Sequence, residues 1–345
     1  MKKVLITGGA GYIGSHTIIE MLENTDWEPI SADNYSNSSA ITFDRIKEIT
    51  GKAVTNYVVD LCDAKGTHAI FEKNPDIAGI IHFAAFKSVP ESVEKPLLYY
   101  HNNIESLVNI LACSKEFKVP HIIFSSSCSV YGDIEKLPVN EDTPISKAES
   151  PYGFTKQIGE QALSDFAKVT DSVKTVALRY FNPVGAHRSG KIGEVPAQRP
   201  NNLVPMITQT AIGKQKEVIV FGDDYKTRDG TCIRDYVHVC DIAKAHISAL
   251  KYLDNDKNAP KFSILNLGTG NGVSVMEMIK TFEKVSGVKL NYRIGPRRLG
   301  DVVAIYSDMS LVKKTLGWTP QYNLDEMMSS AWEWEQNLKK IKVFL

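Results

Sequence analysis

The stretch Thr7-Gly8-Gly9-Ala10-Gly11-Tyr12-Ile13-Gly14 directly follows Lys3-Val4-Leu5-Ile6, an apolar run typical of a β-strand. Its glycines at positions 8, 11 and 14 permit a sharp turn, leave room for a pyrophosphate where a Cβ would stand, and let the next helix begin close to its strand. The free N–H groups and positive dipole end of such a helix favour a bound diphosphate. The stretch therefore predicts a cradle for the phosphates of a nucleotide.

An acidic residue after the second predicted strand indicates which nucleotide the cradle holds. Asp33 ends the run Pro29-Ile30-Ser31-Ala32 and stands 19 residues after Gly14. A carboxylate there can accept hydrogen bonds from both ribose hydroxyls and repels a 2′-phosphate, so it favours NAD over NADP. The glycine spacing is G-x-x-G-x-x-G rather than G-x-G-x-x-G, and the prediction depends on the order of strand, turn, helix, strand and acid.

A second glycine cluster, Gly268-Thr269-Gly270-Asn271-Gly272, also follows a strand-like run, Phe262 to Leu267. It has no acidic residue at the corresponding distance. We interpret it as a structural turn that leads into a helix beginning at Val275.

Composition indicates a globular chain with no net charge that would attract nucleic acid or a membrane. The 345 residues are 43% apolar, and 40 basic residues balance 40 acidic ones, which does not favour nucleic acid or an acidic membrane. No cleavable leader and no apolar stretch near 18 residues is evident. The scattered cysteines at 62, 113, 128, 232 and 240 and the eight histidines show no metal-ligand spacing. We expect reduced thiols, a cytoplasmic location and no metal.

Short β-rich runs alternate with helical segments through the first half of the chain. The runs occupy residues 4–7, 29–33, 56–60, 79–84, 121–125 and 175–181. This alternation predicts an α/β fold with a doubly wound parallel (Rossmann) sheet, which we assign to residues 1–185 as an NAD-binding domain. Between the fourth and fifth runs, Ile104, Leu107, Val108 and Leu111 form one apolar stripe that predicts core burial, part of which could serve a subunit contact.

After Asn182-Pro183 the alternation stops in a loop rich in Gly, Pro and Asn, residues 185–202. We assign residues 186–345 mainly to a smaller, mixed α/β substrate domain, with some segments returning to the first domain. Because ligands of such sheets bind beyond the carboxyl ends of the strands, Asp33, Asp60, Phe83 and Ser125 to Ser127 should face one crevice.

A tyrosine and a lysine four residues apart form the candidate catalytic pair. Tyr152 and Lys156 open a helical segment and should project from one face. An isolated phenol has a pKa near 10, but an adjacent ammonium stabilises the phenolate. The hydroxyl of Ser127, at the end of the fifth predicted strand, could share a substrate proton with Tyr152. These three residues are predicted to be catalytic.

At this point the chain resembles the extended short-chain dehydrogenase/reductase superfamily and, within it, the UDP-glucose 4-epimerases (also called UDP-galactose 4-epimerases), over essentially its full length. The run Arg179-Tyr180-Phe181-Asn182-Pro183-Val184-Gly185-Ala186 and the segment Pro200-Asn201-Asn202-Leu203 are the more specific matches. The further matching stretches are 7–14, 33–34, 82–85, Lys87, 91–93, 125–132, 150–156, 229–231, 234–236 and 297–298.

The resemblance implies three groups of ligand-binding residues. Those that would bind NAD are Gly8, Gly11, Tyr12, Ile13, Gly14, Asp33, Asn34, Asn37, Ser38, Asp60, Leu61, Phe83, Lys87, Asn102, Tyr152, Lys156 and Phe181. Those that would surround the hexose are Lys87, Ser127, Tyr152, Tyr180 and Asn182. Those that would hold UDP are Asn202, Leu203, Phe221, Arg234, Arg298 and Asp301.

The implied activity is an isomerase reaction of galactose and carbohydrate metabolism. It would interconvert UDP-glucose and UDP-galactose by NAD-dependent transient oxidation at sugar C4, through a 4-keto intermediate. A homodimer is also implied, with the stripe around Leu107 and the helix that carries Tyr152 as the expected contact surface. Alternatives are the 4-epimerisation of UDP-N-acetylglucosamine, UDP-xylose or UDP-glucuronate, and, more distantly, a non-catalytic dinucleotide-binding sensor.

Two positions bear on these alternatives. Sugar-nucleotide 4,6-dehydratases resemble one another in an Asp-Glu pair after the hydroxyl residue of the fifth strand, where this chain has Cys128-Ser129, so dehydration is not expected. In the epimerases, the residue four places after the aspartate of Arg-x-Gly-Asp affects room for a 2-acetamido group. Here that residue is Ile305, of intermediate size, which leaves the tolerance for N-acetylated sugars open.

Overall fold

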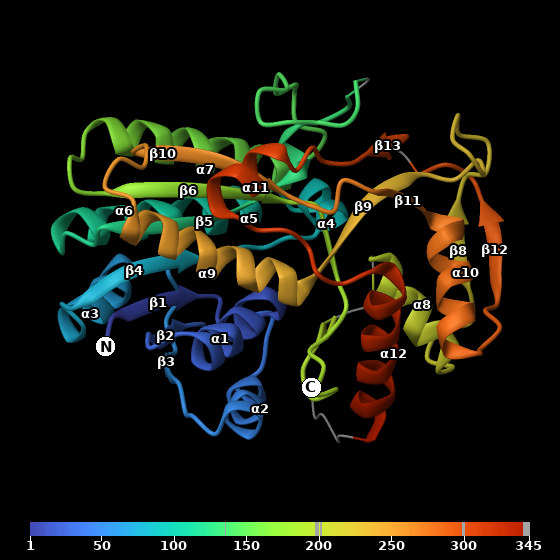
Figure 1. Ribbon diagram of the computed structural model, residues 1–345, viewed down its shortest axis with the longest axis horizontal. Coiled ribbons are helices and arrows are strands. Elements are labelled where there is room, and N and C mark those ends of the chain that lie inside the picture. Colours follow the sequence, from blue (N-terminus) through green and yellow to red (C-terminus); the bar gives the residue numbers. More distant parts are fainter. Residues whose placement is uncertain (135, 197–199, 201, 299–300, 341–345) are drawn as a thin grey trace.

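The computed structural model describes residues 1–134, 136–196, 200, 202–298 and 301–340 (Figure 1). Asn201 of the quoted Asn-Asn-Leu segment and Leu345, the predicted end of the second domain, lie outside the described residues.

A seven-stranded parallel sheet forms the larger part of the molecule, with strand order β10-β6-β5-β4-β1-β2-β3 (Figure 1). Its strands are β1 (Lys3–Thr7), β2 (Glu28–Ala32), β3 (Thr55–Tyr57), β4 (Ile77–His82), β5 (His121–Ser127), β6 (Lys174–Tyr180) and β10 (Phe262–Leu267). In the central register Ile6 lies opposite Ser31 on one side and Ile81 on the other. The predicted doubly wound sheet is confirmed.

The third strand is shorter than predicted, and a seventh strand joins the sheet. The third strand ends at Tyr57, because the chain turns through Asp60, whose carboxylate accepts a hydrogen bond from the N–H of Cys62 at 2.9 Å. The seventh strand, β10, lies well beyond residue 185 and pairs with β6 along its whole length. The sheet is therefore completed by a segment from the second half of the chain.

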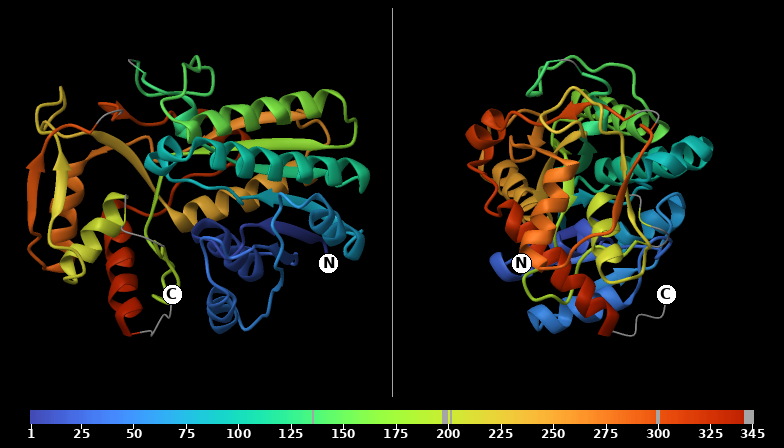
Figure 2. Two further views of the ribbon diagram at one scale, coloured as in Figure 1. Left: turned by 180° about the vertical axis from the view of Figure 1, so that it is seen from behind. Right: turned by 90° about the vertical axis from the view of Figure 1, so that its right-hand side faces the viewer.

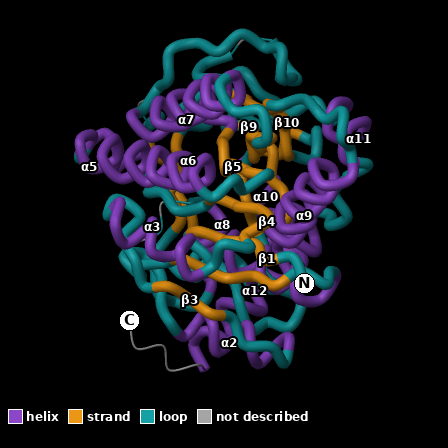
Figure 3. The backbone as a smooth tube through the Cα atoms, turned by 90° about the vertical axis from the view of Figure 1, so that its left-hand side faces the viewer, coloured by secondary structure: helices purple, strands orange, loops and turns teal. Residues whose placement is uncertain are grey.

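Helices cover both faces of this sheet (Figure 3). One face carries α1 (Tyr12–Asn24), α2 (Ile41–Thr50), α9 (Val239–Asn255) and α11 (Ser310–Leu316), and their apolar side chains share one core with β4, β5 and β6. The other face carries α3 (Ala64–Lys73), α6 (Ser106–Glu116) and α7 (Pro151–Lys168) around a second core. Burial of these apolar faces is the main force that holds the layers together.

Shorter helical pieces lead into α6 and α7. They are α4 (Val89–Glu94), α5 (Pro96–Tyr100), the π-helical turn η1 (His101–Glu105) and the 3-10 turn η2 (Cys128–Val130). Within the predicted apolar stripe, Leu107 and Leu111 are buried, whereas Val108 is 51% exposed. The stripe is thus part core and part surface.

The smaller part lies at the carboxyl ends of the strands, to the right in Figure 1 and to the left in the rear view of Figure 2. It contains a small sheet of β11 (Gly272–Ser274), β9 (Ile233–His238) and β13 (Ala304–Ile305), with β7 (Asn182–Val184) also paired to β9, and the separate pair β8 (Val218–Phe221) and β12 (Tyr292–Gly295). Its helices are α8 (Leu203–Ala211), α10 (Val275–Ser286) and α12 (Leu324–Lys340).

This smaller part has a core of its own, built by α8, α10, α12 and the strands beside them. In the described part of the chain, no helix is long and apolar enough to cross a membrane.

Candidate active site

The glycine stretch forms the tight turn between β1 and α1 that the sequence predicts. Gly8 has a φ of +68°, and a Cβ on it would stand 2.9 Å from the backbone nitrogen of Ala84. A Cβ on Gly14 would stand 2.3 Å from the carbonyl oxygen of Gly8. Helix α1 begins at Tyr12 with no side-chain cap from the described residues, so its first N–H groups face the open side of the turn. A side chain at either glycine would collide with the backbone of this turn or of the segment beside it.

Asp33 is fixed at the end of β2, directly beside this turn. Its carboxylate accepts hydrogen bonds from the N–H of Ala10 and of Tyr35, both at 2.9 Å, and from the hydroxyl of Ser38 at 2.7 Å. The side chain nevertheless borders the open cavity beyond the strand ends. The acid is thus oriented by the loop and still available to a ribose.

A cavity of about 340 Å³ runs along the carboxyl ends of the strands, a size within the usual range for small-molecule sites. Every predicted NAD-binding residue except Phe181 borders it, as do Tyr180 and Ser125. Phe181 is buried in a neighbouring apolar cluster with Val130, Tyr131, Val139 and Ile305. The residues that border the cavity come from β2, β5 and β6, from α1, α2, η1, α6 and α7, and from the loops after β1, β2, β3, β4 and β7. A glycine cradle, an adjacent acid and a long cavity fit a dinucleotide.

Tyr152 and Lys156 lie in the first turns of α7, which begins at Pro151 with Ser150 as its N-cap. The ammonium of Lys156 lies 5.9 Å from the centre of the Tyr152 ring and donates hydrogen bonds to the carbonyl of Ser125 at 2.6 Å and to its hydroxyl at 3.2 Å. Both side chains are buried and border the cavity. The predicted pair is therefore brought to the predicted crevice.

The protonation of this pair differs from the sequence-based expectation of a phenolate. Burial raises the pKa of Tyr152 to about 12, although a hydrogen bond with Ser127 acts in the opposite direction. Burial also lowers the pKa of Lys156 to about 7, against the attraction of Glu160. For each residue, the desolvation penalty on the charged form thus exceeds the stabilisation that neighbouring groups give it. Tyr152 is therefore a neutral phenol in this structure.

A buried ion pair lies behind Lys156. The guanidinium of Arg179 donates to the carboxylate of Glu160 through Nε at 2.8 Å and Nη2 at 2.7 Å, and the hydroxyl of Ser126 donates to the same carboxylate. Because Glu160 is one turn beyond Lys156 in α7, this bidentate pair fixes α7 against β5 and β6. Sequence reasoning assigned no role to Glu160.

The residues expected to hold UDP fall into a second group, in the smaller part. Arg298 donates to Asp301 through Nε at 3.1 Å and Nη2 at 2.8 Å, and Arg234 approaches the same carboxylate at 3.5 Å. The Arg298 guanidinium also lies 5.4 Å from the centre of the Phe221 ring. Two forked cations thus share one acid, an aromatic ring lies beside one of these cations, and none of the four residues borders the main cavity.

The remaining predicted residues lie between these two groups or beside them. Asn202 directly precedes α8, Leu203 is its first residue, and Asn182 begins β7. Ser127 ends β5, and its hydroxyl contacts that of Ser129 at 3.0 Å. Ile305 is buried on β13 opposite Arg234.

One carboxylate at the cavity was missed by sequence reasoning. Glu194 accepts hydrogen bonds from Lys87 at 2.9 Å and from Asn202 at 3.1 Å, so it joins a predicted NAD residue to a predicted UDP residue. Its backbone carbonyl accepts from the indole of Trp334 at 2.9 Å. Glu194 sits in the loop that sequence patterns left without structure, and no motif distinguishes it there.

The other singled-out residues have structural surroundings. The backbone of Thr269 and Gly270 donates to the buried carboxylate of Asp235 at 2.8 and 3.1 Å, so the second glycine cluster closes around an acid of the protein itself. The imidazole of His82 contacts the Thr7 hydroxyl at 2.9 Å, and burial lowers its pKa to about 3. Burial raises the pKa of the Cys128 thiol to about 12, which disfavours a nucleophilic thiolate.

Taken together, a glycine cradle, an acid after the second strand and a buried Tyr/Lys pair beside the fifth strand define the class of short-chain dehydrogenase/reductases. The family model described as GDP-mannose 4,6 dehydratase matches residues 5–331. The UDP-glucose 4-epimerase of Bacillus subtilis is 47% identical over 334 residues, 97% of each chain.

Solved structures also show similarity to UDP-glucose 4-epimerases. The UDP-glucose-4-epimerase of Stenotrophomonas maltophila, with bound NAD and formylated UDP-arabinopyranose, matches with a TM-score of 0.94 and 42% identity over 99% of both chains. The enzyme of Bifidobacterium longum, in complex with NAD⁺ and UDP, matches with a TM-score of 0.92 and 46% identity over 97% of this chain and 98% of that one. This chain belongs to the UDP-glucose 4-epimerase family of the extended short-chain dehydrogenase/reductase superfamily.

Proposed function

We propose that the protein interconverts UDP-glucose and UDP-galactose by NAD-dependent transient oxidation at sugar C4, through a 4-keto intermediate. The observation that carries the proposal is that Tyr152 and Lys156 face the same cavity as the glycine cradle and Asp33. A reaction that returns its hydride needs no external oxidant, so a dinucleotide held in a long cavity suffices.

The NAD-binding residues are those that the resemblance implies, and the positions of all of them except Phe181 at the cavity support that role. Gly8, Gly11 and Gly14 leave the N-terminus of α1 open to a pyrophosphate. Asp33 lies where its carboxylate can accept hydrogen bonds from the ribose hydroxyls. When bound, oxidised NAD supplies the hydride acceptor and a positive charge that favours the phenolate of Tyr152.

The chain's own side chains handle the proton. Tyr152 takes the proton of the sugar 4-hydroxyl and later returns it, and Ser127 shares the hydrogen bond to that oxygen. When Tyr152 ionises, the phenolate raises the proton affinity of Lys156, so an ammonium stands beside it while Ser125 fixes the position of that group. The 4-keto group must present its opposite face before reduction, so the hexose has to turn while UDP stays in place.

UDP is held by the group of Arg234, Arg298 and Phe221. Forked guanidinium groups suit a diphosphate, and an aromatic ring suits a uracil. In this form both arginines contact Asp301, so binding of the diphosphate would exchange one anion for another.

Several observations favour epimerisation over related reactions. The hydroxyl residue of β5 is followed by Cys128 and Ser129, so the acid pair that dehydration needs at that position is replaced by a thiol and a hydroxyl. Ile305 is buried at the border between Arg234 and Phe181, where its size would limit an N-acetyl group without excluding smaller sugars. UDP-N-acetylglucosamine, UDP-xylose and UDP-glucuronate stay as the alternative substrates.

A homodimer in the cytoplasm is part of the proposal. Val93, Leu97, Val108 and Phe154 are 62%, 79%, 51% and 46% exposed and lie on α4, α5, α6 and α7. Helices α4 and α5 both pack against α7, and α5, α6 and α7 lie on one side of the molecule (Figure 3). Large exposed apolar side chains gathered on adjacent helices favour a partner surface. The five free thiols suit a reducing compartment. Sedimentation of the protein and of its Leu97→Glu variant tests the dimer.

The activity is tested by offering UDP-galactose to the purified protein with no added cofactor and following UDP-glucose by chromatography. Turnover, together with NAD released on denaturation, is the expected result. A protein that binds NAD but leaves UDP-galactose unchanged would instead be a dinucleotide sensor. Parallel assays with UDP-N-acetylgalactosamine and a UDP-pentose separate the alternative epimerases.

A further inference from the structure

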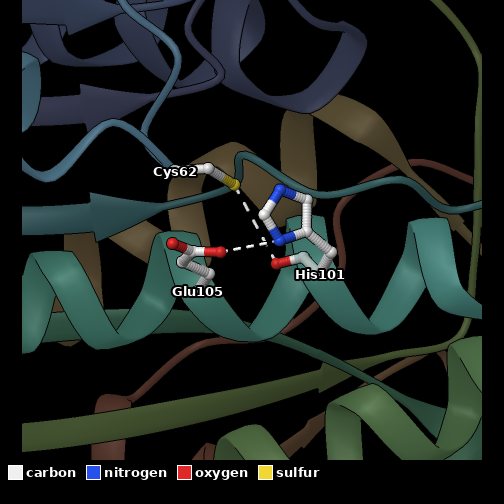
Figure 4. Close-up of side chains that lie close together, drawn as sticks. All are labelled: Cys62, His101 and Glu105. Carbon is white, nitrogen blue, oxygen red and sulfur yellow. Dashed lines mark hydrogen bonds and ion pairs between the residues drawn. The ribbon is translucent and has the colours of Figure 1, made fainter.

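Three metal-ligating side chains meet on the outer wall of the dinucleotide cavity. They are Cys62 in the loop after β3, and His101 and Glu105 at the two ends of the π-helical turn η1. Their sulfur, imidazole nitrogen and carboxylate oxygen all lie within 4.8 Å of one another. Figure 4 shows the three side chains pointing toward a common space from two different elements. In the part of the chain that the structure describes, no second group of this kind occurs.

We propose that Cys62, His101 and Glu105 bind a zinc-type divalent transition-metal ion. A thiolate, an imidazole and a carboxylate are the three donor types that Zn²⁺ uses in proteins, and a water would complete a tetrahedron. The thiol must lose its proton when the metal binds. Thiolate and carboxylate then neutralise the dication, so the filled site carries no net charge.

The present geometry needs a small adjustment to take the ion. Tetrahedral zinc bonds of about 2.0 to 2.3 Å place donor atoms roughly 3.5 Å apart. In the structure the Nδ1 of His101 contacts Glu105 at 2.6 Å, so this pair must open slightly while Cys62 moves inward. The side chains of His101 and Glu105 are 66% and 44% exposed, which leaves both free to change rotamer.

The backbone around the thiol is already fixed. The side-chain amide of Asn109, in α6, donates to the carbonyls of Leu61 and Cys62 at 2.8 and 3.3 Å. The sulfur lies 3.7 Å from the carbonyl oxygen of Asn102. The loop that carries Cys62 is therefore held against the helix that carries the other two ligands, which lowers the ordering cost of binding.

The position of the site connects it to the cavity. Asp60, Leu61 and Asn102, the neighbours of Cys62 and His101 in sequence, all border the cavity. A metal ion would link two segments of the cavity wall, the loop that carries Cys62 and the turn η1 that carries His101, on the side away from the cavity. Metal binding and dinucleotide binding should therefore favour each other, a linkage that rests on the proposed function.

A second histidine provides a matched control. His68 contacts Glu116 at 3.0 Å and Glu72 at 3.6 Å, so it shares a histidine–carboxylate arrangement on the same side of the sheet without belonging to the thiol group. His68→Ala should leave metal affinity unchanged. If metal bound only to surface carboxylates and histidines in general, His68→Ala would weaken metal affinity as much as His101→Ala does.

The experiment titrates the full-length protein, reduced and with its bound dinucleotide retained, with Co²⁺ and Zn²⁺. We expect one Co²⁺ per chain with a thiolate-to-cobalt charge-transfer band, displaced by Zn²⁺. Cys62→Ser should abolish the band, and His101→Ala and Glu105→Gln should each weaken affinity by about tenfold or more. A band that survives in Cys62→Ser, or metal affinity unchanged in all three variants, overturns the proposal.

A second measurement tests the linkage. Zn²⁺ should slow the release of NAD from the wild-type protein and leave the rate unchanged in Cys62→Ser. A cobalt band without this effect would retain the metal site and reject only its coupling to the cavity. Absence of activity on UDP-galactose would change neither the cobalt band nor the rate of NAD release. Failure of the proposed epimerase function can therefore be distinguished from failure of the proposed metal site.

Discussion

Replacement of Lys156 by methionine tests the effect of the positive charge next to the phenol, because it removes the ammonium and keeps a side chain of similar size. The ammonium lies 5.9 Å from the centre of the Tyr152 ring. If this distance is taken as the separation of the ammonium from the phenolate charge, the two interact by about 2.8 kcal/mol at an effective dielectric constant of about 20. Since one pKa unit corresponds to about 1.4 kcal/mol, loss of the cation should raise the pKa of Tyr152 by about two units. The phenolate fraction at neutral pH should then fall about a hundredfold.

The assay is the conversion of UDP-galactose to UDP-glucose at saturating substrate, followed from neutral to alkaline pH. We expect kcat of Lys156→Met to fall about a hundredfold near pH 7 and its rising limb to move upward by about two pH units. Methionine keeps most of the side-chain volume among Phe124 and Tyr152, so packing changes little. NAD content is measured on the same samples, so that lost cofactor is not mistaken for lost catalysis.

Lys168→Met is the matched control, because Lys168 ends the same helix and its side chain is 67% exposed. It should leave kcat and the pH profile unchanged. An unshifted rising limb in Lys156→Met, with NAD still bound, would refute the reasoning and leave Lys156 with a structural role alone.

The remaining predictions concern the phenol, the ribose acid, the substrate border and acid stability. Tyr152→Phe should lower kcat by about a hundredfold or more while NAD stays bound, since a positioned acid/base contributes about that much; near-normal turnover would reject the role. Asp33→Arg should shift binding from NAD toward NADP by about tenfold or more in competitive titrations, because a cation attracts the 2′-phosphate that the carboxylate repels; an unchanged ratio would place ribose recognition elsewhere. Ile305→Gly should raise the ratio of activity on UDP-N-acetylglucosamine to that on UDP-glucose, and a constant ratio would remove Ile305 as a steric limit. Burial lowers the pKa of His16 and of His82 to about 3, so the unfolded chain binds more protons between about pH 6.5 and 3 and the free energy of unfolding should fall as pH decreases through this range, by about 2 kcal/mol per histidine at about pH 5. Urea unfolding at several pH values measures this loss, and midpoints that do not change between neutral pH and about pH 5 would contradict it.

Local sequence patterns were enough for the first half of the fold. Most of the six early strands contain an apolar run, and buried parallel strands have this pattern because both of their faces are covered. The exception is β3 (Thr55–Tyr57), which lies at the edge of the sheet and is partly exposed. The turn at Gly8 and the acid at Asp33 were also predictable, since both depend on residue type at a fixed distance from a strand end. The same holds for Tyr152 and Lys156, four residues apart on one helix.

Contacts between segments that are distant in the sequence could not be predicted from local patterns. The strand-like character of residues 262–267 is local, but its place beside β6 results from packing between distant segments. Glu194 lies in a loop without periodicity, and its contacts with Lys87 and Asn202 exist only after the smaller part folds over the cavity. Val108 has the spacing of a core residue and is half exposed, because helical periodicity does not tell which partner covers a face.

The sequence by itself determined the class of fold, the cofactor NAD and the placement of the proposed acid/base residues on one helix, because each follows from chemistry within a few residues of a strand or helix end. Only the tertiary structure decided the protonation of that pair, since burial raises the pKa of Tyr152 to about 12 and lowers that of Lys156 to about 7. It also brought together Cys62 and His101, which no spacing relates. Desolvation and proximity are properties of the folded chain, and a linear pattern carries neither.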